Sequence, residues 1–407
     1  MQNNFDIIVV GGGIAGSAAA LGLSQMGYKI AHVYPSANTP QAANSWDARI
    51  YALSQSSAAL LRRLRVWDAM DASRICPVSD MKIAGDIEHD DAMRGALHLS
   101  AYSAELSELA WIVEQSNVQQ TLDQALKFTP NLKTYHSTAS ALNLTDAGVT
   151  LSTQSGETLT AALIIGADGA NSWLRDALHI DVHTHDYEQH GVVANFQCER
   201  AHHNTAHQWF LSDGEVLALL PLPNQMVSMV YSATHAHSDD CMRASPDVLA
   251  AHISDLSQHV LGALTPLADA QRFPLKRRRA HTLIATRALL LGDAAHTVHP
   301  LAGQGLNLGL HDLSAWLDIL EQREQHEPHR EIFDTVLLRR YERACATPTF
   351  EMQSVTHALQ KLFASHHPVL RHARNLGMNL LDILPPVKRR LVQQAMGQAP
   401  RKPQNPL

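Results

Sequence analysis

The chain has 407 residues with a formal net charge of −7; 45% of its residues are hydrophobic and 17% are charged. One hydrophobic core rarely supports a chain of this length, so roughly two domains are expected. The composition fits a folded globular enzyme and argues against a disordered chain. The negative charge gives no support for nucleic-acid binding.

Neither the cysteines nor the histidines show the spacing of a metal site. The four cysteines lie far apart and form no CxxC pair, so we predict free thiols in a reducing, cytoplasmic compartment. They are Cys76, Cys198, Cys241 and Cys345. The 25 histidines are scattered, and the pairs at 202–203 and 366–367 lack partners at ligand spacing. We therefore expect no metal.

The beginning of the chain does not resemble a secretion signal. Asn3, Asn4 and Asp6 flank the first apolar run, without a basic segment or a small-residue cleavage site. A run of about 18 apolar residues, which a membrane-spanning helix needs, is also missing. Attachment to a membrane surface stays open.

A strand, a glycine-rich turn and a helix are predicted at the start of the chain. Residues 5–10 read as a buried parallel strand, and GGGIAG and an alanine-rich helix follow at once. Gly11 permits the tight turn, and Gly13 lets a pyrophosphate approach the backbone. Gly16 lets the helix pack closely on the strand. Because another strand follows at 29–34, this context predicts a dinucleotide site.

One residue expected in such a unit is missing. The second strand should end in an acid that binds the ribose hydroxyls, about 20 residues after the glycines. Tyr34 stands there instead, and the next acid is Asp47. The ribose contact then comes from a phenol hydroxyl, the backbone or water. We therefore predict that the dinucleotide is bound less tightly than usual.

A second glycine-rich stretch follows an apolar run late in the chain. Residues 288–291 predict a buried strand, and Gly292–Asp293 ends it with a carboxylate. Gly303, Gly305 and Gly309 keep one face of the following backbone free of Cβ atoms. The N–H groups of a helix start can face the anionic side of a reduced flavin. The stretch suits a ribityl chain and a heterocycle, with a purely structural turn as the alternative.

Other polar residues could reach the same cofactor. Asp168 ends a further apolar strand in an acid–glycine turn, and Arg175 lies in the helix after it. Arg49 lies in a loop before a predicted helix, and Gln115 lies near the start of a helix expected over 112–126. A solvated arginine and a surface glutamine are the alternatives.

The pattern of apolar and polar residues changes between residues 187 and 275. Short alternating runs with turn signals between them predict a mostly antiparallel sheet, and a helix is expected over 245–261. The basic run at 276–279 reads as a solvated strand entrance or as a binding patch. Residues 366–407 combine seven Lys or Arg with apolar residues, which suits a membrane surface or a partner protein, or else a helical cap.

Three motifs occur together in order: GGGIAG at 11–16, GADGANSWLR at 166–175 and GDAAHTVHPLAGQGLNLG at 292–309. The combination resembles the group A flavin-dependent aromatic hydroxylases, and most of all the ubiquinone-biosynthesis hydroxylases of the UbiH/UbiF/UbiI (VisC) type. VEQSNVQQTL at 113–122 is similar to their internal helix motif. RRYERA at 339–344 and LPPVKRRLVQQAMG at 384–397 look closest to the UbiI-like branch.

The resemblance implies a mixed α/β fold of the p-hydroxybenzoate-hydroxylase type. A Rossmann-type FAD-binding domain would carry an inserted antiparallel-sheet substrate domain and a helical C-terminal segment. The FAD-binding domain is expected at 1–75, 100–180 and 276–335, the substrate domain at 76–99 and 181–275, and the C-terminal segment at 336–407.

The resemblance also implies one FAD per chain and a set of residues around it. Gly11, Gly13 and Gly16 match the pyrophosphate loop, and Asp293 matches the acid that holds the ribityl chain. The segment beside the isoalloxazine is matched by Pro300, Gly305, Leu306 and Asn307. Positions that touch FAD are matched by Arg49 and Gln115, and Asp168 with Gly169 matches a motif linked to both FAD and NAD(P)H.

The activity implied is hydroxylation of the aromatic ring of a polyprenylated phenol in ubiquinone biosynthesis. NAD(P)H would be a transient co-substrate, and O₂ would react through a flavin C4a-hydroperoxide. The protein would exclude bulk water and position the ring. No base that activates the phenol is assigned; His296 and His299 lie near the flavin segment in sequence, and structural roles are favoured for both.

Three alternatives share some of these features. The first is a hydroxylase of another phenol or ring position. The second is a flavin-dependent prenyl reductase, which would not need O₂ in turnover. The third is a non-catalytic lipid-binding subunit of a biosynthetic complex, for which Tyr34 is the only hint.

Overall fold

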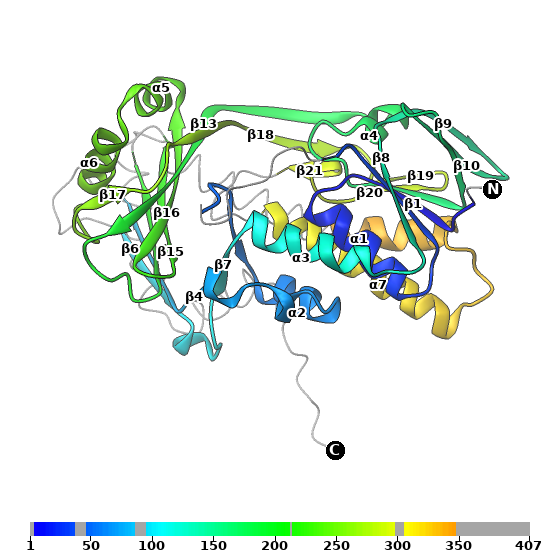
Figure 1. Cartoon of the computed structure of the whole chain (residues 1–407), viewed down its shortest axis with the longest axis horizontal. Coiled ribbons are helices and arrows are strands. Elements are labelled where there is room, and N and C mark those ends of the chain that lie inside the picture. The colour runs from blue at the N-terminus through cyan, green and yellow to red at the C-terminus, as the bar shows by residue number, and fades with distance from the viewer. Residues whose placement is uncertain (1–3, 37–45, 86–94, 212–213, 298–304, 347–407) are drawn as a thin grey trace, which may run out of the picture.

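The computed structural model describes residues 4–36, 46–85, 95–211, 214–297 and 305–346. Two lobes are joined by two long paired strands, β13 (Val182–Cys198) and β18 (Gln271–Ala280), as Figure 1 shows. One lobe is built on a parallel sheet and the other on a nine-stranded sheet. None of the helices in these ranges combines the length and the apolar composition that crossing a membrane requires.

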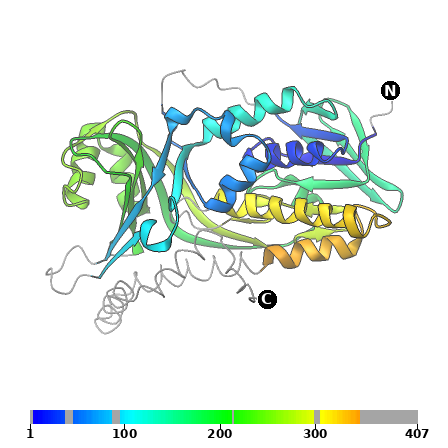
Figure 2. The ribbon, with the colours of Figure 1, turned by 90° about the horizontal axis from the view of Figure 1, so that it is seen from below.

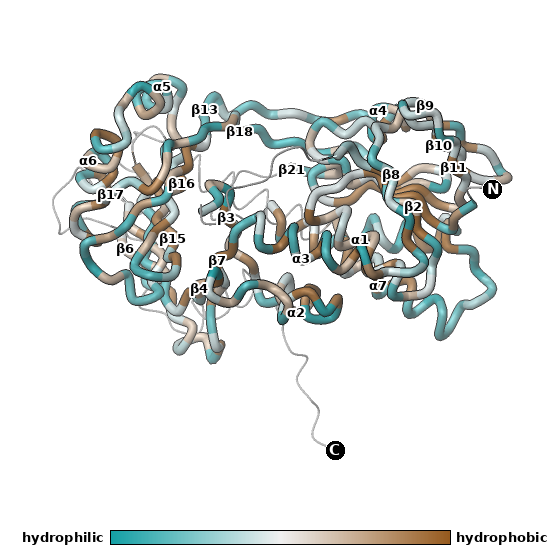
Figure 3. Tube along the Cα trace, viewed as in Figure 1, coloured by the Kyte–Doolittle hydropathy of each residue, from teal (hydrophilic) through white to brown (hydrophobic). Residues whose placement is uncertain are grey.

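The parallel sheet has the order β19-β20-β12-β1-β2-β8. Its strands are β1 (Ile7–Val10), β2 (Ile30–Tyr34), β8 (Leu132–His136), β12 (Leu163–Gly166) and β20 (Ala288–Leu290), with antiparallel β19 (Ile284–Ala285) at one edge. Every residue of β1, β12 and β20 is buried, which is why these strands read as unbroken apolar runs. Figure 3 shows them as the hydrophobic centre of this lobe.

Three helices lie side by side against this sheet. They are α1 (Ile14–Gln25), α3 (Gln115–Lys127) and α7 (Gly305–His326). Figure 2 shows α1 between α3 and α7, with a further helical stretch at 335–346 beside α7. A small antiparallel sheet packs on β1 and β12; its strands are β9 (Ala139–Thr145), β10 (Gly148–Thr153) and β11 (Thr158–Ala161).

The nine-stranded sheet has the order β21-β18-β13-β16-β15-β14-β5-β6, and β17 also pairs with β13. The remaining strands are β5 (Asp80–Gly85), β6 (Ala96–Ser100), β14 (Thr205–Phe210), β15 (Val216–Leu222), β16 (Met226–Thr234), β17 (Leu264–Pro266) and β21 (His296–Thr297). All its pairings are antiparallel except that of β14 with β5. The prediction of a mostly antiparallel sheet is thus confirmed.

Each face of this sheet has its own partner. Helices α5 (His235–Arg243) and α6 (Pro246–Leu256) cover one face. The other face packs on a small sheet of β3 (Ile50–Leu53), β7 (Ala110–Glu114) and β4 (Ile75–Val78). The short helices are α2 (Gln55–Arg63), α4 (Trp173–Ala177), and the 3-10 turns at Trp67–Ala69, Ala72–Arg74, Tyr102–Ala104 and, labelled η6, Gly292–Ala294.

Two of the predicted helices have different bounds in the structure. The helix expected from residue 112 begins only at Gln115, because Ile112 and Val113 belong to β7 and pair with β3 and β4. The helix expected to reach 261 ends at Leu256, and Gln258 and His259 then adopt positive φ angles of 55° and 51°. The proposed domain boundaries remain predictions.

Candidate cofactor and substrate site

The carboxyl ends of β1, β12 and β20 lie next to one another and carry the three predicted motifs. The chain leaves β1 toward β2 on one side and reaches β12 on the other, so the strand order reverses at β1. In open parallel sheets, ligands bind outside the strand ends at such a point. The topology therefore brings Gly11, Asp168 and Asp293 to one edge.

The three glycines of the first turn serve different purposes. Gly11 has a φ angle of +122°, and a Cβ atom there would lie 2.1 Å from the carbonyl oxygen of Ala167. A Cβ atom on Gly16 would lie 2.1 Å from the carbonyl oxygen of Gly11. A Cβ atom on Gly13, in contrast, would meet no atom of the described residues within 4 Å. Gly13 precedes α1 and has no side chain to cap its first N–H groups, which leaves a site for an anion.

The turn that carries Asp293 touches the start of α1. A Cβ atom on Gly292 would lie 3.5 Å from Cβ of Ala15 and 3.6 Å from Cα of Gly309. The backbones of η6, α1 and α7 thus meet two residues from Gly13. The first turn and Asp293 therefore belong to one site.

Two arginines lie near the Asp293 carboxylate. The Asp293 side chain itself is accessible to solvent. Partial burial raises the pKa of Asp293, and the positive charges of His296, Arg278 and Arg49 act against that rise. Arg278 comes from the basic run on β18, so this part of the run faces the site.

The loop before β3 holds Arg49 and Gln115 together. Asp47 accepts hydrogen bonds from the backbone N–H of Arg49 (2.9 Å) and of Ser116 (3.1 Å). The N–H of Gln115 donates to the carbonyl of Arg49 at 3.0 Å, and buried Glu114 accepts the N–H of Asp47 at 2.6 Å. This network places the predicted pair beside the first turn of α3.

A side-chain bridge connects α3 to the first turn. Gln119 donates to Ser17 Oγ at 3.1 Å, and Ser17 Oγ donates to the carbonyl of Gly12 at 3.2 Å. Gln115 lies one helical turn before Gln119. Helix α3 therefore begins close to the glycine-rich turn that contains Gly12.

The carboxylate of Asp168 accepts hydrogen bonds from residues of its own turn. Its two oxygens accept hydrogen bonds from Ser172 Oγ (2.5 Å) and from the N–H of Leu174 (3.0 Å). Arg175, which is buried, donates to the carbonyls of Ala170 (3.1 Å) and Ala294 (3.4 Å). This guanidinium ties the second motif to the turn of the third.

The side-chain amide of Asn307 is occupied as well. Its Oδ1 accepts the N–H of Ser54 (2.9 Å) and the hydroxyl of Ser57 (2.7 Å), and its Nδ2 donates to the carbonyl of Ala52 (2.7 Å). One N–H of Nδ2 and the backbone are therefore left for a contact of Asn307 with a flavin. Gly305 and Leu306 begin α7, whereas Pro300 and His299 lie outside the described residues.

Comparison with known proteins identifies the class of this site. A family model described as an FAD-binding domain matches residues 4–351. The chain is 35% identical over 394 residues to 3-demethoxyubiquinol 3-hydroxylase of Escherichia coli, covering 96% of this chain and 98% of that protein. The chain belongs to the family of FAD-dependent ubiquinone hydroxylases.

Other relatives agree with this family. Ubiquinone hydroxylase UbiL of Rhodospirillum rubrum is 28% identical, covering 98% of this chain and 91% of that protein. The crystal structure of PqsL, a probable FAD-dependent monooxygenase of Pseudomonas aeruginosa, has a TM-score of 0.76 at 19% identity, covering 93% of this chain and all of that one. The p-nitrophenol 4-monooxygenase PnpA of Pseudomonas putida has a TM-score of 0.75 at 17% identity, covering 98% and 100%. The expected fold is confirmed; the UbiI-like branch stays a prediction.

The residues of this hydroxylase fit FAD. The open space at Gly13 and the first N–H groups of α1 suit an anionic pyrophosphate. The Asp293 carboxylate directly follows Gly292, which contacts Ala15, and it can accept hydrogen bonds from ribityl hydroxyls.

Tyr34 packs on the glycine-rich loop of the hydroxylase. A Cβ atom on Gly12 would lie 2.3 Å from the Tyr34 ring, which shows how closely the ring approaches the loop. His32, which the sequence did not point to, lies 2.8 Å from the carbonyl of Gly11 through Nε2. Burial lowers the pKa of His32 to about 4, so the neutral imidazole donates this bond.

We expect FAD to be partly lost from the purified enzyme on extensive dialysis. The phenol of Tyr34 offers a weaker ribose contact than a carboxylate, which can accept two hydroxyl hydrogen bonds. The measurement is the ratio of flavin absorbance to protein absorbance before and after dialysis. A fully loaded enzyme after dialysis would contradict the expectation.

A buried ion pair lies behind the Asp293 turn. His296 Nε2 lies 2.8 Å from Asp312 Oδ2, at an angle that is not that of a regular hydrogen bond. The two side chains are 1% and 0% exposed. The same oxygen accepts the N–H of Gly292 at 3.0 Å. Burial would lower the pKa of His296, but Asp312 outweighs burial and raises it. The structural role expected for His296 fits this geometry.

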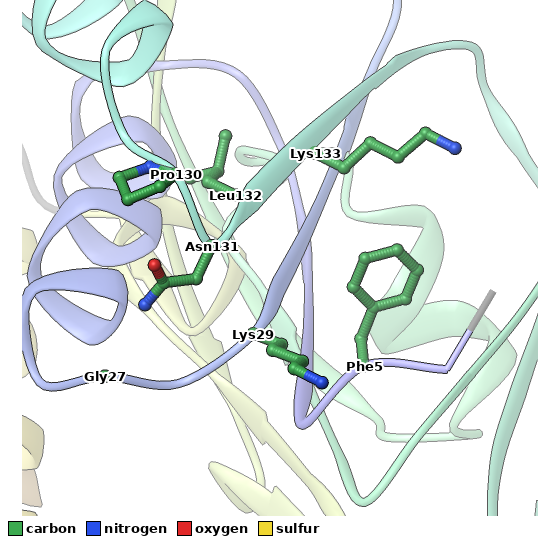
Figure 4. A pocket seen from close by; sticks show the side chains of 7 residues that line it. All are labelled: Phe5, Gly27, Lys29, Pro130, Asn131, Leu132 and Lys133. Atoms are coloured by element: carbon green, nitrogen blue, oxygen red, sulfur yellow. The ribbon is translucent and has the colours of Figure 1, made fainter.

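A separate hollow of about 440 Å³ lies at the opposite end of the sheet. Figure 4 shows its lining, made by Phe5, Gly27, Lys29, Pro130, Asn131, Leu132 and Lys133. These residues precede or open β1, β2 and β8, at the amino ends of the strands. This hollow is therefore distinct from the cofactor site.

Proposed function

We propose that this enzyme hydroxylates the aromatic ring of a polyprenylated phenol in ubiquinone biosynthesis, with NAD(P)H and O₂ as co-substrates. The observation that carries the proposal is the meeting of Ala15, Gly292 and Gly309 beside Gly13 and Asp293, in a chain similar to ubiquinone hydroxylases over nearly its full length. When bound, FAD supplies the electron transfer and the oxygen chemistry.

We propose a separate role for each of the cofactor-binding residues. Gly13 and the first turn of α1 bind the pyrophosphate, and Gly11 and Gly16 shape that turn. Asp293 accepts hydrogen bonds from the ribityl hydroxyls, and the charges of His296, Arg278 and Arg49 oppose the rise that burial gives to its pKa. The other proposed contacts are Gln115, Asp168, Pro300, Gly305, Leu306 and Asn307.

We also propose that the substrate domain is formed by residues 76–99 and 181–275. The support is that β5 and β6 join the same sheet as β13 to β16. The face of that sheet away from α5 and α6 packs on the small sheet of β3, β7 and β4, and β3 directly follows the loop with Arg49. A ring held there would be kept from bulk water, and exclusion of water suppresses unproductive release of hydrogen peroxide.

The test is aerobic NAD(P)H oxidation with a short-chain prenylphenol and isotopically labelled O₂. We expect product that carries one labelled oxygen atom. Oxidation without O₂ that saturates a prenyl double bond would identify a reductase instead. Failure to bind added FAD would identify a non-catalytic subunit.

We propose that the enzyme is cytoplasmic and that its basic C-terminal part binds an anionic membrane surface or another ubiquinone-biosynthesis protein. The four cysteines are buried free thiols, as a reducing compartment permits. An apolar prenyl chain partitions into a bilayer, so the substrate favours contact with a membrane. Residues 347–407, which include the basic part, lie outside the described residues.

Removing the residues after Arg374 is expected to weaken vesicle binding without abolishing flavin binding. The deletion removes five Lys or Arg, each worth about 1 kcal/mol near an anionic surface, so a loss of at least about tenfold is expected. Pelleting with anionic lipid vesicles measures the binding, and flavin absorbance is the control. Unchanged pelleting would refute the proposal.

A further inference from the structure

The inner face of the nine-stranded sheet is defined here by the residues that point toward β3 and β7. On β16, Met226 and Val230 pack into the cluster with Ile50 and Ile112, whereas Val227 and Met229 pack on the other side with α5 and α6. Side chains alternate between the two faces along a strand, so Ser228, between Val227 and Met229, belongs to the inner face with Met226 and Val230. By the same alternation, Asn195 on β13 points inward, because Ala194 and Phe196 pack on the α5 and α6 side.

Two polar atoms on this inner face have no hydrogen-bond partner among the described residues. Asn195 is 3% exposed and Ser228 is 0% exposed. Asn195 Oδ1 and Ser228 Oγ are buried without a hydrogen bond. The two residues are directly opposite each other in the β13–β16 register. Buried polar atoms normally find partners, so two unsatisfied neighbours in an apolar face indicate a missing ligand.

The amide of Asn195 is held in a fixed orientation. Its Nδ2 donates to the carbonyl of Asp47 at 3.0 Å. A polar pair on the opposite face is satisfied, since Glu215 accepts the hydroxyl of Tyr231 at 2.5 Å. That pair makes its hydrogen bond, whereas the two inner-face atoms make none with the described residues. The oxygen of Asn195 remains as an acceptor, and the Ser228 hydroxyl remains as a donor.

This polar pair lies beside the loop that reaches the cofactor site. The carbonyl of Asp47 holds Asn195, and the Asp47 carboxylate accepts the N–H of Arg49. The positive charge of Arg49 in turn acts to lower the pKa of Asp293. Ile50 follows this loop as the first residue of β3 and packs on the inner face. A ring between the loop and this face would have apolar walls, with one polar point at Asn195 and Ser228.

We propose that Asn195 Oδ1 and Ser228 Oγ bind a ring hydroxyl of the phenolic substrate. The phenol O–H donates to Asn195 Oδ1, and the Ser228 O–H donates to the phenol oxygen. Both groups are neutral, so they position the hydroxyl and do not remove its proton. The inference rests on the proposed function and adds the residues that select a phenol over a ring without a hydroxyl. A site built to bind a hydroxyl rejects an analogue that lacks it, because its polar groups are then left unpaired.

The test compares Ser228→Ala with Ser232→Ala in the full-length, FAD-loaded enzyme. Ser232 lies on the same face of β16, roughly 13 Å further along the strand. For Ser228→Ala we expect an unchanged or raised Tm, because an unsatisfied buried hydroxyl is removed. We expect KM for a short-chain prenylphenol to rise by about tenfold, with FAD content unchanged. Ser232→Ala should leave KM unchanged.

A second measurement uses a prenylbenzene without the ring hydroxyl as a competitive inhibitor. The unaltered enzyme should bind it poorly, and Ser228→Ala should bind it as well as or better than the unaltered enzyme does. A fall in Tm together with an unchanged KM for Ser228→Ala would show that the serine is structural and would overturn the inference. Turnover of prenylphenol by the unaltered enzyme keeps this result separate from the proposed function, since lack of that turnover would overturn both.

Discussion

Replacing Gly13 with alanine is expected to leave the apoprotein folded and to weaken FAD binding by about tenfold or more, which is about 1.4 kcal/mol. Gly13 has φ −74° and ψ 176°, which alanine adopts without strain, and its Cβ atom would meet nothing within 4 Å in the part of the chain that the structure describes. The added methyl group would therefore occupy only the space that the pyrophosphate needs.

Gly16→Ala is the matched control for this prediction. Its Cβ atom would lie 2.1 Å from the carbonyl oxygen of Gly11, so α1 could not pack on β1 and the fold should be lost. Thermal unfolding followed by circular dichroism reports the fold, and a fluorescence titration with FAD reports binding. Normal FAD affinity in folded Gly13→Ala would show that the pyrophosphate binds elsewhere.

The elements that the sequence revealed are those fixed by local rules. The strand before Gly11, the turn and the helix after Gly16 follow from an apolar run and from glycine spacing, and all three appear in the structure. The strand at Ala288–Leu290 is recognised in the same way. Burial on both faces leaves an unbroken apolar run, which is visible without knowledge of the partner strands.

The elements that were misread depend on distant partners. The local pattern predicts a helix at Ile112 because its neighbours continue as one, yet Ile112 pairs with Ala52 and Cys76 in a strand. The polar half of β13 was missed because residues such as His183 and Thr184 become a strand only by pairing with Arg279 and Arg278. Tertiary pairing outweighed the local pattern in both places.

In the site, too, some features follow from the local sequence and others depend on distant partners. Its glycines and Asp293 could be read from motifs, whereas the partners that hold them could not. His32 binds the loop carbonyl, and Asn195 reaches Asp47 across 148 positions of sequence. Nothing in the local pattern distinguishes such a histidine or asparagine from a surface residue, because its role is set by the atom that it meets.

Asp312→Asn is expected to destabilise the enzyme by about 3–5 kcal/mol, because it leaves His296 buried without its counter-charge. Asp312 Oδ2 also accepts the N–H of Gly292, so the turn that carries Asp293 should loosen and FAD affinity should fall. The control is Asp318→Asn on the same helix, whose exposed pair with Arg63 should be worth at most about 1 kcal/mol.

The destabilisation by Asp312→Asn is expected to depend on pH. Because the pair raises the pKa of folded His296, its contribution is complete below the ordinary histidine pKa and is lost as the pH rises through the raised value. The difference in unfolding free energy between the two proteins should therefore be largest at acidic pH and shrink at alkaline pH. Urea unfolding at several pH values measures it. A difference that stays constant with pH would mean that His296 is neutral in the folded enzyme, and that Asp312 acts through the Gly292 hydrogen bond alone.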